Sequence, residues 1–244
     1  MMLSVSRTLA EARALWRRDR DLLVRIALPF ILLPSLALQL LVPPPLAVPV
    51  GTGLADAFRL QSQFAGEHAG AYLLAAAMIE YGHAALVAFY VDPRATDMRG
   101  LLGRAAIAWP RFVLLGIVIE FVTLGGILFF VAGRLLPAGA ALIAAPRRGT
   151  IGAARRALRL TAGETLTTSA LAAGLIAARL LLLWPFAGMD GWLRALNAPN
   201  PVALAIVDAA GAGVTMLVTI AGVLIAVVLY RALSSEEGGA SIGT

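Results

Sequence analysis

The side chains best suited to chemistry are a few charged residues inside long apolar segments. Glu80 and His83 are three positions apart, which places both on one face of a helix. Di-metal carboxylate bundles use this spacing, but they need a second copy of it and two further glutamates. The other histidine, His68, lies in a predicted loop, so we expect no metal site. We interpret the pair as a hydrogen bond between helices, and a proton relay is the alternative.

Four further charges fall within the apolar segments, namely Arg134, Arg179, Glu120 and Asp208. A charge at the centre of a bilayer costs about 2.5–3.5 kcal/mol on insertion scales, so it is normally paired or hydrated. Because arginine has no accessible neutral form, we expect Arg134 and Arg179 to share one polar cluster with Glu120 or Asp208. Three interpretations of these charges stay open: ion pairs that lock the bundle, a polar cavity for a substrate such as an anionic headgroup, and snorkelling to the interface.

Catalytic motifs are missing from the sequence. It has no cysteine, which excludes thiol catalysis, disulfides and cysteine-bound metals. No glycine-rich phosphate loop follows a strand pattern, and no nucleophile-elbow sequence occurs. Serine, histidine and aspartate are too sparse for a convincing triad. We therefore expect no enzymatic activity, no catalytic residues and no cofactor.

The composition is that of a membrane protein. Of the 244 residues, 60% are apolar and 14% are charged, where a soluble domain has about 25% charged residues. Such a chain has too little polar surface for a water-soluble fold and is too apolar for disorder. All 20 basic residues are arginines and flank apolar runs, so the net charge of +6 indicates membrane lipids rather than nucleic acid as partners. We predict one all-α, polytopic transmembrane domain.

Six spans are predicted, since a spanning helix needs about 20 mostly apolar residues. The apolar stretch before Pro146 is too long for one helix and short for two, and Gly125-Gly126 offers a turn inside it. Pro29 and Pro34 predict a kink in the first span. The predicted spans cover residues 22–42, 70–91, 109–124, 127–146, 165–187 and 202–230.

The arginines also predict an orientation. The segments 1–25, 92–111 and 147–164 and the tail from Arg231 together hold sixteen arginines. The loops on the other side hold only two arginines, Arg59 and Arg194. Because cytoplasmic segments of membrane proteins are enriched in arginine, we expect both termini to be cytoplasmic.

Three basic segments, 4–20, 96–109 and 149–163, alternate arginines with apolar residues at helical spacing. This pattern is typical of short amphipathic helices that lie at the headgroup level. In the third segment we expect three arginines to contact lipid headgroups, namely Arg155, Arg156 and Arg159. We infer a threefold repeat of an interfacial helix and a helical hairpin, and similarity of composition alone is the alternative.

Small residues recur at every fourth position of the last span, at Ala205, Ala209 and Gly213. Small residues at this spacing let two helices pack closely. The pattern predicts a contact either within the chain or between copies in a homo-oligomer, and the sequence leaves both open.

A series of motifs between residues 130 and 185 resembles a known family. It consists of Arg134-Leu135-Leu136-Pro137, Ala145-Pro146, Gly149, Ala153–Arg156 and Leu160-Thr161-Ala162-Gly163. The series is similar to the glycerophosphodiester phosphodiesterase membrane domain and to YciC-like proteins of the bacterial inner membrane. Ala157 departs from that pattern, which usually has serine there.

The resemblance implies a six-helix module in the bacterial cytoplasmic membrane. It does not imply the phosphodiesterase activity, which belongs to a separate soluble barrel. Our leading hypothesis is therefore a non-enzymatic membrane scaffold or membrane-homeostasis protein. The first alternative is a small transporter or lipid-handling protein that uses the buried charges, and the second is a membrane-embedded enzyme.

Overall fold

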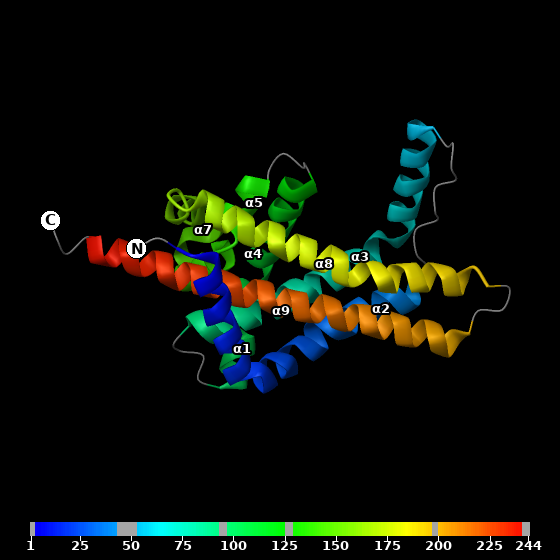
Figure 1. Ribbon diagram of the computed structural model, residues 1–244, viewed down its shortest axis with the longest axis horizontal. Coiled ribbons are helices and arrows are strands. Elements are labelled where there is room, and N and C mark those ends of the chain that lie inside the picture. Colours follow the sequence, from blue (N-terminus) through cyan, green and yellow to red (C-terminus); the bar gives the residue numbers. More distant parts are fainter. Residues whose placement is uncertain (1–2, 43–52, 93–96, 125–128, 197–199, 241–244) are drawn as a thin grey trace.

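The computed structural model describes residues 3–42, 53–92, 97–124, 129–196 and 200–240, and every element within these ranges is a helix (Figure 1). The all-α prediction is confirmed for this part of the chain. The longer helices are α1 (Val5–Ala27), α2 (Leu33–Leu41), α3 (Leu54–Val91), α4 (Met98–Leu124), α8 (Thr165–Arg194) and α9 (Pro201–Ala240). The shorter elements are the π turn η1 (Leu28–Leu32), α5 (Phe129–Leu135), α6 (Ala138–Ala144), the 3₁₀ turn η2 (Pro146–Arg148) and α7 (Gly149–Leu160).

Five helical segments in the described ranges are long and apolar enough to cross a membrane. Each overlaps one of the predicted spans, but most begin earlier or end later than predicted. The five segments are Val5–Leu41, Gly66–Val91, Met98–Ile119, Thr165–Arg194 and Pro201–Ser235. The second and fifth predicted spans therefore continue into helical turns that the sequence assigned to loops.

The remaining predicted span, 127–146, is not one long helix in the described residues. Its described part forms α5 and α6, which are separated at Leu136 and Pro137. The proline ring cannot donate a backbone hydrogen bond, which favours a break at this point. The apolar segment Phe130–Ala144 is shorter than a full span, so the sixth crossing is not confirmed. The predicted turn at Gly125-Gly126 lies outside the described residues.

Prolines shape the first and third candidate spans in different ways. At Pro29 the α-helical hydrogen bonding of α1 gives way to the wider π turn η1. Figure 1 shows that α1 and α2 run in clearly different directions, so the predicted kink is present. In α4, by contrast, the helix continues through Pro110, and the basic segment 98–109 is not a separate interfacial helix. Only α7 forms the short separate helix that was expected.

The long helices give the molecule two distinct ends (Figure 1). The start of α1, the helix α7, the start of α8 and the end of α9 lie at one end. The end of α8 and the start of α9 lie at the other, so these two helices form an antiparallel pair that packs along its length. The segments that carry most of the arginines therefore share one end of the bundle.

The protein core lies towards the arginine-rich end. Fully buried side chains from several helices meet there, among them Leu23, Ile31, Leu86, Leu142 and Val227. Helix α8, in contrast, exposes large apolar residues along its length, including Leu166, Leu180, Leu181, Trp184 and Trp192. Exposed apolar surface on this scale is unfavourable in water and is expected of a helix that faces lipid.

Candidate functional site

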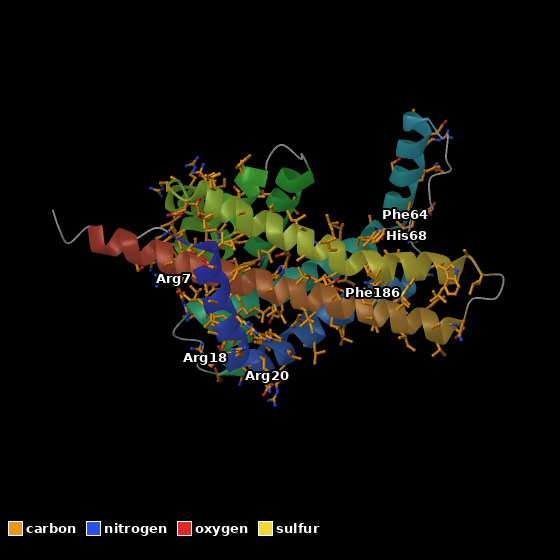
Figure 2. All side chains as sticks on the ribbon, viewed as in Figure 1. Arg7, Arg18, Arg20, Phe64, His68 and Phe186 are labelled. Carbon is orange, nitrogen blue, oxygen red and sulfur yellow. The ribbon has the colours of Figure 1, made fainter. Side chains whose placement is uncertain are left out.

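A polar cavity of about 430 Å³ lies between α2, α3, α8 and α9. Figure 2 labels one of its apolar lining residues, Phe186, where α8 and α9 run side by side. Although these four helices are strongly apolar, eight of the sixteen residues that line the cavity are polar or charged. The polar lining residues are Ser35, Gln39, Tyr72, Arg179, Asp190, Arg194, Asp208 and Thr215.

The polar cavity runs from the end of α8 to its middle. Arg194 is the last residue of α8, and Arg179 lies fifteen positions earlier, at the centre of the candidate span Thr165–Arg194. At 1.5 Å per residue, the two arginines are separated by about 22 Å along the helix axis. A bilayer has a hydrocarbon core of about 30 Å, so the cavity would reach its middle in such a bilayer.

An ion cluster occupies the shallow end of the cavity. The Nε of Arg194 donates to both carboxylate oxygens of Asp190, at 2.7 and 2.9 Å. The Nη2 of Arg194 also lies 3.7 Å from Oδ2 of Asp208, whose side chain is only 7% exposed. The cluster thus joins α8 to α9 and balances one guanidinium against two carboxylates.

At the deep end, Arg179 has no such partner. Within the described part of the chain its guanidinium makes neither a hydrogen bond nor an ion pair with a carboxylate. The hydroxyl of Ser35, a residue that is 7% exposed, also lines the cavity and lacks a hydrogen-bond partner. The Ser35 hydroxyl is buried, where polar groups are normally hydrogen-bonded, whereas Arg179 is exposed, and both groups are available to a ligand.

Glu80 and His83 lie close to this deep end. The Nδ1 of His83 and Oε2 of Glu80 are 3.1 Å apart, and Ile79, next to Glu80, lines the cavity. Arg179 is near enough for its charge to act on His83. The predicted hydrogen bond thus forms within α3 rather than between helices. No group of three or more metal-ligating side chains occurs among the described residues.

The structure places Arg134 elsewhere, against the prediction that it clusters with Arg179. Arg134 donates from Nη2 to the carbonyl oxygen of Leu158, and its Nε lies 3.4 Å from Oγ1 of Thr161. Leu158 is in the last turn of α7, where carbonyl groups have no partner within the helix. A cation there also interacts favourably with the helix dipole. Arg134 therefore caps α7 rather than neutralising a carboxylate.

Of the other predicted site residues, the side chain of Glu120 lies outside the described ones. On α7, Arg155 and Arg159 are exposed, as headgroup contacts require, whereas Arg156 packs over the ring of Tyr230 at 6.0 Å. The buried residues of α7 hold it against the bundle.

The small-residue face of α9 is not closely packed within the described residues. Ala209 is exposed, and a Cβ added at Gly213 would meet no atom within 4 Å.

Sequence reasoning missed part of the site. It assigned Arg194 and Asp190 to an outer loop, although their spacing of four positions is typical of an ion pair on a helix. The same spacing relates Ser35 to Gln39 on α2, where two polar residues in an apolar span could have indicated a polar face.

No protein-family model matches the chain, and neither a curated protein nor a solved structure matches it.

Proposed function

We propose that this chain is an integral membrane protein that binds an anionic group in the polar cavity, and that it handles lipid or carries a small solute without catalysing a reaction. The group is a phosphate or carboxylate, borne by a lipid headgroup or by a free solute. The observation that carries this proposal is Arg179, half-way along α8, which forms no ion pair with a carboxylate among the described residues.

The chemistry of the deep end favours an anion over a cation. Asp190 and Asp208, the acidic lining residues, both lie close to Arg194 at the shallow end. A guanidinium forms two parallel hydrogen bonds with a phosphate or carboxylate, and these bonds strengthen where water is scarce. The hydroxyl groups of Ser35 and Tyr72 line the same cavity and could donate further hydrogen bonds to the bound group.

A scaffold without a ligand was the leading hypothesis from the sequence. A scaffold has no use for an unpaired charge in the middle of a spanning helix, since such a charge lowers stability. A ligand-binding protein retains such a charge because the bound anion neutralises it. The polar cavity therefore favours the lipid-handling or transport alternative.

For the membrane arrangement we propose six crossings, with α5 and α6 forming part of the fourth, and both termini in the cytoplasm of a bacterium. The grouping of arginine-rich segments at one end of the molecule supports this orientation. The threefold repeat remains a proposal that rests on the sequence pattern. The resemblance to the glycerophosphodiester phosphodiesterase membrane domain likewise rests on residues 130–185 alone.

Thermal unfolding of the purified protein in neutral detergent tests the ligand proposal. A ligand that binds the folded state raises the unfolding temperature. Phosphatidylglycerol should stabilise the wild type more than phosphatidylcholine does, and Arg179→Gln should reduce that difference. Arg59→Gln is the matched control, because Arg59 carries the same charge on the projecting start of α3, 70% exposed and outside the cavity.

The same assay separates the two sources of the anion. Stabilisation by inorganic phosphate alone identifies a free solute, and stabilisation by phosphatidylglycerol alone identifies a lipid. If Arg179→Gln responds to both additives as the wild type does, the proposal is wrong and the scaffold hypothesis returns.

A further inference from the structure

A second, separate cavity lies further along α9, where the basic helix α1 crosses it. This groove has a volume of about 420 Å³. Four residues of α1 and four of α9 line it, and all but one are apolar. They are Leu9, Ala12, Arg13, Trp16, Leu217, Ala221, Leu224 and Ile225. We name it the α1–α9 groove.

We propose that the α1–α9 groove binds one acyl chain of an anionic phospholipid from the cytoplasmic leaflet, with the lipid phosphate held by Arg13. This site shares no residue with the polar cavity, so the inference does not depend on the proposed function.

The depth of the groove fits an acyl chain. Measured along α9 from Arg231, which marks the cytoplasmic end of the predicted span, Ile225 lies about 9 Å deep and Leu217 about 21 Å deep. Helix α1 belongs to the candidate span Val5–Leu41, and its arginines favour a position of the α1–α9 crossing towards the headgroups, which long cationic side chains can reach. The groove below α1 therefore lies among the acyl chains of one leaflet.

The shape and lining of the groove favour lipid over a protein segment. Leu9 and Leu217 are 46% and 48% exposed, so the groove opens outward at these two residues. An acyl chain has no hydrogen-bonding groups. A peptide in an apolar groove would have to form hydrogen bonds with its own backbone N–H and C=O groups. An acyl chain fills such a space without that penalty.

The charge at the rim favours an anionic lipid. Arg13 is the one charged lining residue, is exposed, and has no hydrogen bond or ion pair with the described residues. Trp16 lies one turn further along the same face, and tryptophan is enriched at the headgroup level of membranes. Figure 2 labels three more arginines along α1, Arg7, Arg18 and Arg20, each of which forms an ion pair with a carboxylate of the same helix.

Trp16 provides a probe for this site. The protein is placed in phosphatidylcholine vesicles. A minor fraction of the lipid has brominated acyl chains and is either phosphatidylglycerol or phosphatidylcholine. Brominated chains quench tryptophan fluorescence on contact. Brominated phosphatidylglycerol should quench more than the same fraction of brominated phosphatidylcholine. Trp16→Phe should lower this excess, because the other three tryptophans lie outside the groove.

Arg13→Gln should lower the preference for phosphatidylglycerol about fivefold, the factor that matches one arginine near an anionic surface. Arg17→Gln is the control, since Arg17 is exposed on the same helix but does not line the groove. Equal quenching by both lipids in the wild type would overturn the inference, as would weak quenching of Trp16 by either. An equal loss of the preference for phosphatidylglycerol in Arg13→Gln and Arg17→Gln would also overturn it. That result would show that the lipid is attracted by the total charge of α1 rather than by Arg13.

Discussion

The guanidinium of Arg194 at the end of α8 lies 3.7 Å from the buried carboxylate of Asp208 on α9. Because Arg194 also holds Asp190, it is shared between two carboxylates that would otherwise face each other. This ion cluster lines the shallow end of the polar cavity and leaves Arg179 as the cation at the deep end.

Replacing Arg194 should therefore cost more than replacing either acid. We expect Arg194→Ala to lower the free energy of unfolding by about 1–2 kcal/mol, because two carboxylates lose their shared counterion while a third of the arginine side chain was exposed. Adding Asp208→Asn to Arg194→Ala should recover part of the loss. Chemical unfolding in detergent measures Arg194→Ala, Asp208→Asn and the double variant, and strictly additive losses would show that the residues do not interact.

A close approach between α5 and α8 gives a test of the packing. A Cβ at Gly133 would lie 2.7 Å from Cα of Ser169, a backbone atom that cannot move aside. Gly133→Ala should therefore destabilise by about 1–3 kcal/mol, as overpacking does. Gly174→Ala on α8 is the matched control, because its Cβ would meet no atom within 4 Å, and it should be neutral or stabilising. Similar unfolding temperatures for both variants would contradict this packing.

The capping role of Arg134 predicts a local effect on α7. Arg134→Ala should lower stability by about 1.5–3 kcal/mol, since a charged donor to the carbonyl of Leu158 is lost. Arg155→Ala removes the same charge from an exposed position on α7 and should change stability little. Proteolysis near residues 149–160 provides a second measurement, because an uncapped α7 should open more often. Equal behaviour of the two variants would argue against the cap.

The proposed orientation is tested by reporter fusions after Gly66, Ala198 and Thr244. An alkaline phosphatase reporter should be active after Gly66 and Ala198 and inactive after Thr244, because the arginine-rich segments are retained in the cytoplasm. An active reporter after Thr244 would exclude a cytoplasmic C-terminus and the six-span arrangement with it.

Much of the fold could be predicted because hydropathy and arginine position are local properties of the sequence. The separate helix at 149–163 was expected, and the structure has it at Gly149–Leu160, where the positive φ of Gly149 allows the sharp entry after Pro146. The effect of a proline was less predictable. Pro29 adjoins a π turn, yet α4 passes through Pro110 without a break, since the surrounding helices decide whether a proline ends a helix.

The partners of the charges could not be predicted in the same way. The sequence shows that Arg134 and Arg179 need partners, but not which way each faces around its helix. Arg134 binds a backbone carbonyl, and every residue offers one, so no sequence signal marks it. The unpaired hydroxyl of Ser35 could not be predicted either, because its environment depends on how four helices pack together.

The account depends most on the claim that Arg179 binds an anion in the polar cavity. Native mass spectrometry of the protein, released from detergent with phosphatidylglycerol and phosphatidylcholine present in equal amounts, measures this directly. The wild type and Arg59→Gln should retain phosphatidylglycerol preferentially, and Arg179→Gln should lose about tenfold or more of that affinity, as expected for a charged hydrogen-bond partner. Equal retention of phosphatidylglycerol by Arg179→Gln, together with no stabilisation of the wild type by free phosphate, would contradict the claim.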